Sequence, residues 1–167
     1  MHKSSKLIQS GIGLFMTGSN GVGKTYVLSM MLKDFVCTGY PSFFITADDL
    51  FAMKTDGWSD PVEKARFNKK VKNSRLLVVD DIGKEFGNRL TKQVFESLIR
   101  YRVQNSLTTF VSSNKTLDEL GDEYGRSFRS LLDESFILEN VEADDVRPTA
   151  LTERVKEAEL GWSRPIM

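Results

Sequence analysis

The segment Gly18–Thr25, which reads Gly-Ser-Asn-Gly-Val-Gly-Lys-Thr, constrains the fold of this chain more than any other feature. It fits the P-loop pattern G-x-x-x-x-G-K-[ST] at every fixed position. Glycines let the backbone curl so that successive N–H groups converge on phosphate oxygens, and the following helix points its positive end at the same anion. We therefore expect a phosphate site between a strand and a helix.

The flanking residues support this arrangement. Leu14–Thr17, ahead of the loop, is a short apolar run typical of a buried strand. The residues after the loop have helical spacing up to Val36, with one face formed by Val27, Met31 and Phe35. The sequence predicts a strand over Gly13–Thr17, then the loop, then a helix that stops near Gly39.

Two side chains of the loop carry chemistry. Lys24 can reach the β- and γ-phosphates of a nucleotide, and the Thr25 hydroxyl can hold Mg²⁺. A Gly-rich turn without a ligand is the alternative. The predicted nucleotide-binding residues are Gly18, Ser19, Asn20, Gly21, Val22, Gly23, Lys24, Thr25 and Tyr26.

A second landmark is Leu76–Asp81, which reads Leu-Leu-Val-Val-Asp-Asp. Four consecutive apolar residues suit a strand buried on both faces, as in a parallel sheet. Asp80 and Asp81 stand where such a strand emerges at its C-terminal end, the edge at which α/β sheets bind ligands. We interpret the segment as a Walker B motif. Asp80 would position Mg²⁺ mainly through its water shell, and Asp81 would orient or deprotonate the attacking water; capping carboxylates are the alternative.

Composition excludes several functional classes. The 167 residues, 40% hydrophobic and 28% charged, suit one soluble globular domain. The formal net charge of +0 gives no overall attraction to nucleic acid or membranes. The single cysteine, Cys37, excludes an internal disulfide, and we expect a packed thiol in a reducing cytoplasm. The single histidine, His2, argues against a His-based centre, and no apolar run approaches the ~20 residues of a membrane span.

Strand-like and helix-like segments alternate along the rest of the chain. This alternation predicts a three-layer α/β domain with a mainly parallel central sheet. Further strands are expected over Pro41–Thr46, Thr108–Asn114 and Phe136–Leu138. Further helices are expected over Ala47–Lys54, Val62–Lys72, Leu90–Arg102, Leu117–Tyr124 and Gly125–Leu132.

Two of these helices have informative surfaces. The helix predicted over Val62–Lys72 carries five basic residues, which indicate a solvated face, with nucleic-acid contact as the alternative. The helix predicted over Leu90–Arg102 has Arg100 and Arg102 near its C-terminal end, where cations are favourable. Its apolar side is predicted to consist of Leu90, Val94, Leu98 and Tyr101.

After the P-loop come three strings in a characteristic order: Phe44–Leu50 (Phe-Ile-Thr-Ala-Asp-Asp-Leu), Leu77–Gly83 (Leu-Val-Val-Asp-Asp-Ile-Gly) and Ser112–Leu120 (Ser-Ser-Asn-Lys-Thr-Leu-Asp-Glu-Leu). In this order the chain resembles the AAA+ ATPase core of bacterial and phage replicative helicase loaders of the DnaC type. It is also similar to transposition helper ATPases of the IstB type. The resemblance covers roughly Gly13–Arg147 and implies an AAA+ P-loop NTPase fold that lacks a large helical lid domain.

The resemblance also implies roles for polar residues outside the Walker motifs. Asn114 matches the sensor-1 residue, a strand-end amide that contacts the γ-phosphate or the attacking water. Arg126 and Arg129 match the helix that holds the arginine finger, which acts on a neighbouring subunit's nucleotide. This pair is three residues apart where the family spaces it four apart, so either could be the finger, and we favour Arg129. Arg147, in Asp-Val-Arg, matches a residue that senses nucleotide within its own subunit; a surface charge is the alternative for each arginine.

Three regions are expected: a polar leader (1–10), the AAA+ core (11–140) and a C-terminal extension (141–167) with one helix over Thr149–Leu160. The long loaders grip the helicase through an N-terminal domain that this sequence does not contain. The contact would then come from a partner, from the leader or from the extension, unless the helicase is not the partner.

The function implied by the resemblance is a Mg²⁺-dependent ATPase that acts as a switch in DNA replication, a phage-type helicase loader in the cytoplasm of a bacterial cell or phage-infected host. ATP and Mg²⁺ are the expected cofactors. The expected partners are the replicative helicase, weakly bound single-stranded DNA and further copies of the chain in an ATP-dependent oligomer. A transposition helper on duplex DNA, an assembly module with little turnover and a small-molecule kinase are the alternatives. The expected catalytic residues are Lys24, Asp81, Asn114, Arg129 and Arg126.

Overall fold

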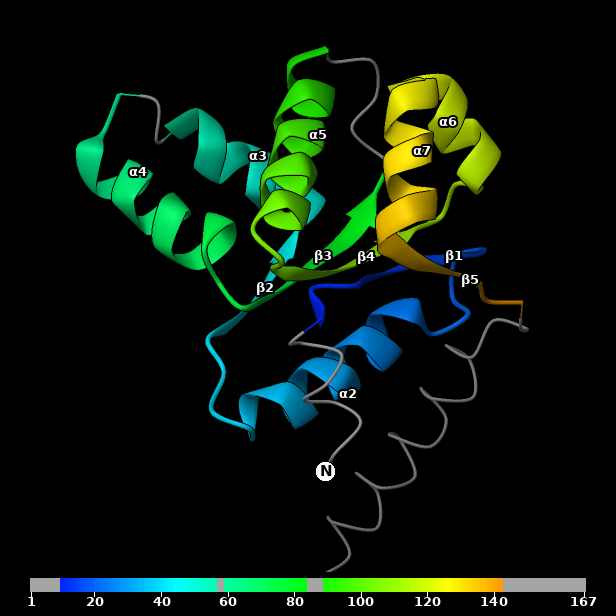
Figure 1. The fold of residues 1–167 in the computed structure, drawn as a ribbon, viewed down its shortest axis with the longest axis horizontal. Helices are drawn as coiled ribbons and strands as arrows, with labels where there is room; N and C mark the ends of the chain where they lie inside the picture. Colours follow the sequence, from blue (N-terminus) through cyan, green and yellow to red (C-terminus); the bar gives the residue numbers. More distant parts are fainter. Residues whose placement is uncertain (1–9, 57–58, 84–88, 143–167) are drawn as a thin grey trace, which may run out of the picture.

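Five short strands form one parallel sheet in the order β2-β3-β4-β1-β5 (Figure 1). The structure is a computed structural model, and it describes residues 10–56, 59–83 and 89–142. Each predicted strand is present within two residues of its expected ends, which confirms the mainly parallel sheet. The strands are β1 (Gly13–Thr17), β2 (Ser42–Thr46), β3 (Leu76–Ile82), β4 (Thr108–Ser113) and β5 (Phe136–Asn140).

Helices cover both faces of this sheet. Figure 1 shows α2 on one face and the remaining helices on the other, which gives the three layers that the alternating pattern predicts. The helices are α2 (Lys24–Val36), α3 (Ala47–Asp56), α4 (Pro61–Phe67), the π-helix η1 (Asn68–Lys72), α5 (Arg89–Gln104), α6 (Leu117–Tyr124) and α7 (Arg126–Ser135).

The central strand β3 has consecutive apolar residues because helices cover both faces of the sheet at this strand. Successive side chains of a strand point to opposite faces. Leu77 and Val79 belong to the larger core cluster, together with residues of α5, and Leu76 and Val78 belong to the cluster around α2. Because a helical layer covers each face, every residue from Leu76 to Val79 is fully buried.

Local hydrogen bonds fix where three of the helices begin. The Thr46 hydroxyl accepts from the Asp49 N–H at 3.2 Å at the start of α3. The Asp60 side chain accepts from the Val62 N–H at 2.8 Å at the start of α4. A capping box between Thr116 and Glu119 begins α6. These caps satisfy N–H groups that have no partner within their own helix.

The apolar side predicted for α5 is confirmed only in part. Phe95, Leu98 and Ile99 face the core, whereas Leu90 is 53% exposed. Arg102, near the C-terminal end of the helix, is completely buried. Its guanidinium donates to the Thr109 hydroxyl and to carbonyl oxygens on both neighbouring segments. Burial and the nearby Arg75 guanidinium lower the pKa of Arg102 to about 9, so it stays charged at neutral pH.

The helix after the P-loop also differs from its prediction. Leu28 and Phe35 form its buried face, and Val27 is 39% exposed. Cys37, the residue that follows the last turn of α2, is an exposed free cysteine rather than a packed thiol. The single helix expected over Val62–Lys72 is divided into α4 and η1.

Among the described residues, no helix is long and apolar enough to span a membrane. The polar leader and the C-terminal extension, with its helix at Thr149–Leu160, lie almost wholly outside the described ranges.

Candidate nucleotide-binding site

The P-loop connects the end of β1 to the start of α2. Gly23 precedes α2 with a φ of 92°, in the left-handed region that favours glycine, and no side chain caps the helix. The first N–H groups of α2 are thus left for an anion. Gly18 fits where no other residue does, because a Cβ there would lie 2.3 Å from the carbonyl oxygen of Val141.

Lys24 lies across the loop. Its side chain is buried, and the ammonium donates to the carbonyl oxygens of Gly18 at 2.7 Å and Ser19 at 2.9 Å. The charge is therefore held within the curl of the loop, where phosphate oxygens would replace neutral carbonyls as its acceptors. Hydrogen bonds between charged groups are the stronger kind.

Asp80 and Thr25 meet at the junction of the two Walker motifs. The Thr25 hydroxyl lies 2.9 and 3.1 Å from the two carboxylate oxygens of Asp80, which is only 7% exposed. Among the described residues, only hydroxyl groups donate to this carboxylate, and no Lys or Arg pairs with it. A buried anion that faces a hydroxyl without a counter-charge suits a divalent cation.

The same junction indicates which cation fits. The described residues contain no group of three or more His, Cys, Asp or Glu side chains that could hold a metal by themselves. Mg²⁺ is commonly bound by one or two protein oxygens together with substrate phosphates and water. The pair Thr25 and Asp80 matches that donor set.

Ser112 is a site residue that the sequence analysis missed. Its hydroxyl, 1% exposed, accepts from the Asp81 N–H at 2.9 Å and donates to the Asp80 carboxylate. Ser112 thereby fixes the orientation of both Walker B residues. Asp81 has a φ of 67°, which is uncommon outside glycine and turns it away from the strand path. The sequence signal that could have identified Ser112 is its position near the end of the neighbouring strand, two residues before Asn114.

Asn114 shares a hollow with the P-loop. The hollow has a volume of about 390 Å³, and its lining includes Gly18, Ser19, Asn114 and Asn140. Asn114 follows β4, which pairs with β1, so its side chain stands at the same edge of the sheet as the loop. The sheet thus brings together the P-loop, Asp80, Asp81 and Asn114, as predicted from the ends of parallel strands.

Polar contacts tie the end of β3 to the turn that carries Asn114. The Ser113 hydroxyl donates to the Ile82 carbonyl at 2.8 Å and accepts from the Lys115 N–H at 3.0 Å. The Lys115 ammonium pairs with Glu123 on α6, which also pairs with Lys92 on α5. Burial raises the pKa of Glu123, but hydrogen bonds from the two lysines outweigh burial and place it below its usual value.

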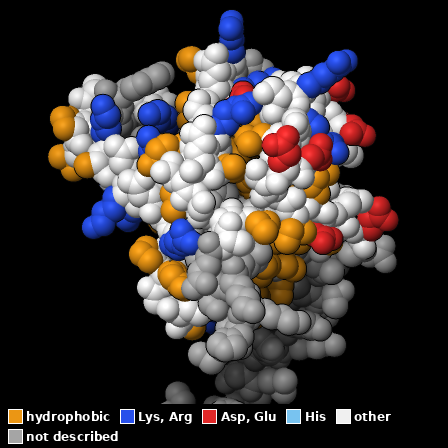
Figure 2. All heavy atoms as spheres, in the orientation of Figure 1, with side chains coloured by type: hydrophobic (Ala, Val, Ile, Leu, Met, Phe, Trp, Pro, Cys, Tyr) orange, Lys and Arg blue, Asp and Glu red, His pale blue; other side chains and the backbone are white. Residues whose placement is uncertain are grey.

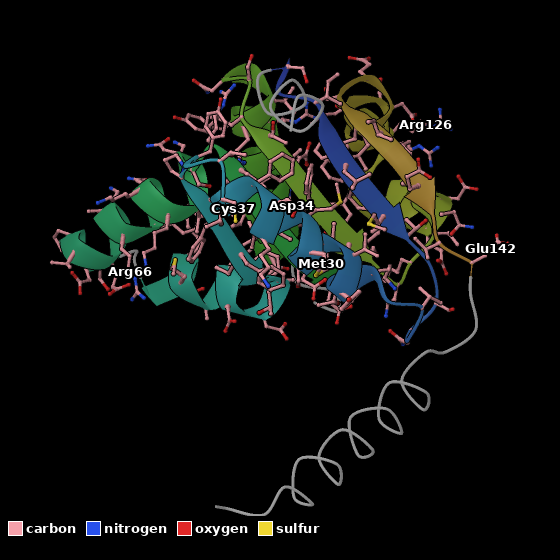
Figure 3. The ribbon with its side chains drawn as sticks, turned by 90° about the horizontal axis from the view of Figure 1, so that it is seen from below. Met30, Asp34, Cys37, Arg66, Arg126 and Glu142 are labelled. Carbon is pink, nitrogen blue, oxygen red and sulfur yellow. The ribbon has the colours of Figure 1, made fainter. Side chains whose placement is uncertain are left out.

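The two arginines of α7 lie in different surroundings. Arg129 donates to Asp133 at 3.1 and 3.2 Å and to Asp118 at 3.3 Å. Arg126 is exposed and has no hydrogen bond or ion pair with the rest of the described chain (Figure 3). Both arginines line a hollow on the α6–α7 side that shares no lining residue with the hollow of Asn114.

Two further predictions concern individual residues. Tyr26, in the first turn of α2, is 70% exposed. Arg147 lies outside the described residues, as does most of the loop between β3 and α5.

Comparison with known proteins agrees with this geometry. Residues 3–133 match the family described as IstB-like ATP binding protein. The chain belongs to this family. It is 27% identical over 154 residues to the replicative helicase loader DnaI of Bacillus subtilis (strain 168), covering 92% of this chain and 46% of DnaI. It is 32% identical over 76 residues to an insertion sequence IS21-like putative ATP-binding protein of Bacteroides fragilis (strain YCH46), covering 45% and 37% of the two chains.

The fold comparison gives the same assignment. The crystal structure of the DnaC helicase loader superimposes with a TM-score of 0.70 at 28% identity, covering 81% of each chain. The chain is therefore an ATP-binding AAA+ P-loop protein, which confirms the predicted family and fold. Membership favours an ATP-binding AAA+ role over the small-molecule kinase. The chain spans less than half the length of the curated relatives it matches.

Proposed function

We propose that this protein is a Mg²⁺-dependent ATPase that acts as a nucleotide-dependent switch in loading a replicative helicase. The observation that carries the enzymatic part is the buried Asp80 carboxylate, held by the Thr25 hydroxyl beside Lys24. These three groups provide a cation ligand, a hydroxyl ligand and a phosphate-binding ammonium at the start of one helix.

In the proposed reaction, water attacks the γ-phosphate in line with the leaving oxygen. Lys24 contacts the β- and γ-phosphates, and bound Mg²⁺ supplies positive charge there. Asp81 orients the water or accepts its proton, and Asn114 contacts the water or the γ-phosphate across the hollow that it shares with Gly18. Ser112 is a positioning residue, since it acts only through the two aspartates.

We propose that Arg126, rather than the Arg129 favoured by sequence, is the arginine finger of a neighbouring subunit. A finger must reach across an interface to a phosphate. Two carboxylates hold Arg129 in its own subunit, whereas Arg126 is exposed and has no such partner among the described residues. Arg129 would then fix the α6–α7 hairpin that presents Arg126.

The helicase role rests on similarity to DnaI and DnaC and on the extent of that similarity along this chain. The test is a binding assay between the purified chain and the host replicative helicase, with ATP, with ADP and without nucleotide. ATP-dependent binding that Lys24→Ala abolishes is the expected result. Equal binding in all three states would contradict a nucleotide switch.

A transposition helper is the second candidate, because the family description and the Bacteroides fragilis relative belong to IS21-type ATPases. ATPase assays with single-stranded DNA, duplex DNA and neither separate the two. Stimulation by duplex DNA alone would favour the transposition role. An assembly module with little turnover would show ATP-dependent oligomers without stimulation by either.

A further inference from the structure

Helix α5 has two apolar stripes, one fully in the core and one at the edge of the core. Phe95 and Ile99 lie in the core. The stripe predicted from sequence, which includes Val94, Leu98 and Tyr101, joins the core at Leu98 and also lines a hollow of about 480 Å³. We call this hollow the α5 groove; its opposite wall is formed by Lys54 of α3, Phe67 of α4, and Asn68 and Lys72 of η1.

The wall formed by η1 is held rigidly. The Arg102 guanidinium donates to the carbonyl oxygens of Val71, Lys72 and Ser74 at the end of η1, at 3.0 to 3.1 Å. It also donates to Thr108 and Thr109 of β4, so one buried side chain joins this wall to the sheet. A groove whose walls are already in place loses little conformational freedom on binding. Short π-helical segments occur frequently at functional sites.

The charge of the groove has one sign. Its lining includes two lysines, Lys54 and Lys72, and no Asp or Glu. Exposed Lys69 and Lys70 extend the positive surface along η1. Figure 2 shows Lys and Arg side chains over the α4 side of this face, whereas Asp and Glu side chains gather over the α6–α7 side, mixed there with Lys and Arg. A ligand of the α5 groove would therefore have apolar side chains where it enters the groove and acidic side chains that face the lysines at the edges of the groove.

The aromatic rings of the groove favour a peptide over nucleic acid. Bases bind single-strand sites by stacking on open aromatic faces. Here the Lys54 ammonium lies 5.1 Å from the centroid of the Phe67 ring, and the Lys72 ammonium lies 3.9 Å from that of Tyr101. The protein's own cations thus cover a face of each ring. The aliphatic side chains of Val94 and Leu98 between them match leucine-type anchors of a helix.

We propose that the α5 groove is a docking site for an acidic amphipathic helix of a partner protein. Aliphatic side chains of that helix insert between α5 and η1, and its Asp or Glu residues face Lys54 and Lys72. The proposal goes beyond the nucleotide switch and can fail independently of it, because the α5 groove shares no lining residue with the hollow beside the P-loop.

The test uses fluorescein-labelled peptides and the full chain without nucleotide. Three peptides carry the same leucine stripe at i, i+3, i+4 and i+7 and differ only in the residues that flank the stripe, which are Glu, Lys or Gln. A fourth peptide keeps the Glu residues but has Ser in place of the leucines. Anisotropy measures affinity, and backbone NMR shifts locate the bound peptide. We expect the Glu-flanked leucine peptide to bind about tenfold or more tightly than the others and to shift α5 and η1.

Two variants block the α5 groove without touching the core. Ser97→Trp places a large side chain in it from an exposed position, and its control, Ser29→Trp, is exposed on α2 across the sheet. Lys72→Glu reverses one groove charge, and Lys33→Glu is its control on α2. We expect each groove variant to weaken the Glu-flanked peptide by about tenfold or more and each control to leave it unchanged.

Three results would overturn the proposal. The first is that no peptide binds or shifts α5 and η1. The second is that the Lys-flanked peptide binds as tightly as the Glu-flanked one. The third is that labelled oligothymidylate, rather than any peptide, is the ligand that Ser97→Trp displaces, which would make the groove a nucleic-acid site.

Discussion

Replacing Ser112 by Ala tests whether this hydroxyl fixes both Walker B aspartates. The change removes a bond to a charged acceptor, Asp80, and leaves the Asp81 N–H without its acceptor at 2.9 Å. A bond to a charged group contributes about 1.5–3 kcal/mol, and the neutral bond from the half-buried Asp81 N–H contributes about 0.5–1.5 kcal/mol. We therefore expect the free energy of unfolding to fall by about 3 kcal/mol in urea titrations followed by circular dichroism.

The neighbouring serine is the matched control. The Ser113 hydroxyl bonds only to neutral backbone groups, those of Ile82 and Lys115, so Ser113→Ala should cost about 1–2 kcal/mol.

The two variants should also differ in Mg²⁺ binding. Because Ser112 orients Asp80, the proposed magnesium ligand, Ser112→Ala should reduce Mg²⁺-dependent affinity for a fluorescent ATP analogue by about ten- to a hundredfold, and Ser113→Ala should change it far less. Stability within about 0.5 kcal/mol of the parent, with unchanged Mg²⁺ dependence, would refute the assigned role.

Three further predictions follow from the site. Lys24→Ala should abolish ATP binding in calorimetry and lower the thermal midpoint without abolishing cooperative unfolding, because the buried ammonium donates to two loop carbonyl oxygens; parental affinity would contradict the P-loop assignment. Asp81→Asn should keep Mg·ATP binding and lose most turnover, whereas Asp80→Asn should also weaken Mg²⁺-dependent binding; normal turnover by Asp81→Asn would place the base elsewhere, with Glu85 as the next candidate. Weak single-stranded DNA binding should have a salt slope of roughly 0.7 log units per phosphate contact; replacing Lys69 and Lys70, which lie outside the α5 groove, by Glu tests one candidate patch for it, and unchanged affinity would leave these lysines as a solvated face.

The strands and the phosphate site could be predicted because their signals are local. A fixed-spacing motif identifies the P-loop, and an uninterrupted apolar run before Asp80 identifies a strand covered on both faces. The ends of parallel strands meet at one edge, so placing each strand also placed Asp80, Asp81 and Asn114 together.

The exceptions depend on contacts between segments distant in sequence. Arginine is usually a surface residue. The burial of Arg102 depends on hydrogen bonds to the carbonyl groups of Val71 and Ser74, which precede it by 31 and 28 residues in the sequence. Helical spacing on α5 finds an apolar stripe but does not show which of two stripes the sheet covers. Cys37 follows an apolar helix, yet it is exposed, which the apolar composition of that helix does not predict.

Ser112 illustrates a different limit. The sequence shows two serines before Asn114, and either could be an ordinary strand residue. Only the register between β3 and β4 brings the Ser112 hydroxyl within bonding distance of Asp80 and the Asp81 N–H. Side-chain roles that depend on strand register therefore require the structure.

The central claim is that this ATPase completes its site with Arg126 from a neighbouring subunit, and subunit mixing tests it most directly. A finger supplied by another subunit contributes about 10³–10⁵ in turnover. We predict that specific activity rises with protein concentration. The Arg126→Ala variant should bind ATP normally but not turn it over, and mixing this variant with Lys24→Ala subunits should restore activity. The Arg129→Ala variant should retain more turnover than Arg126→Ala. Turnover that is independent of concentration, together with no recovery in the mixture, would contradict the claim.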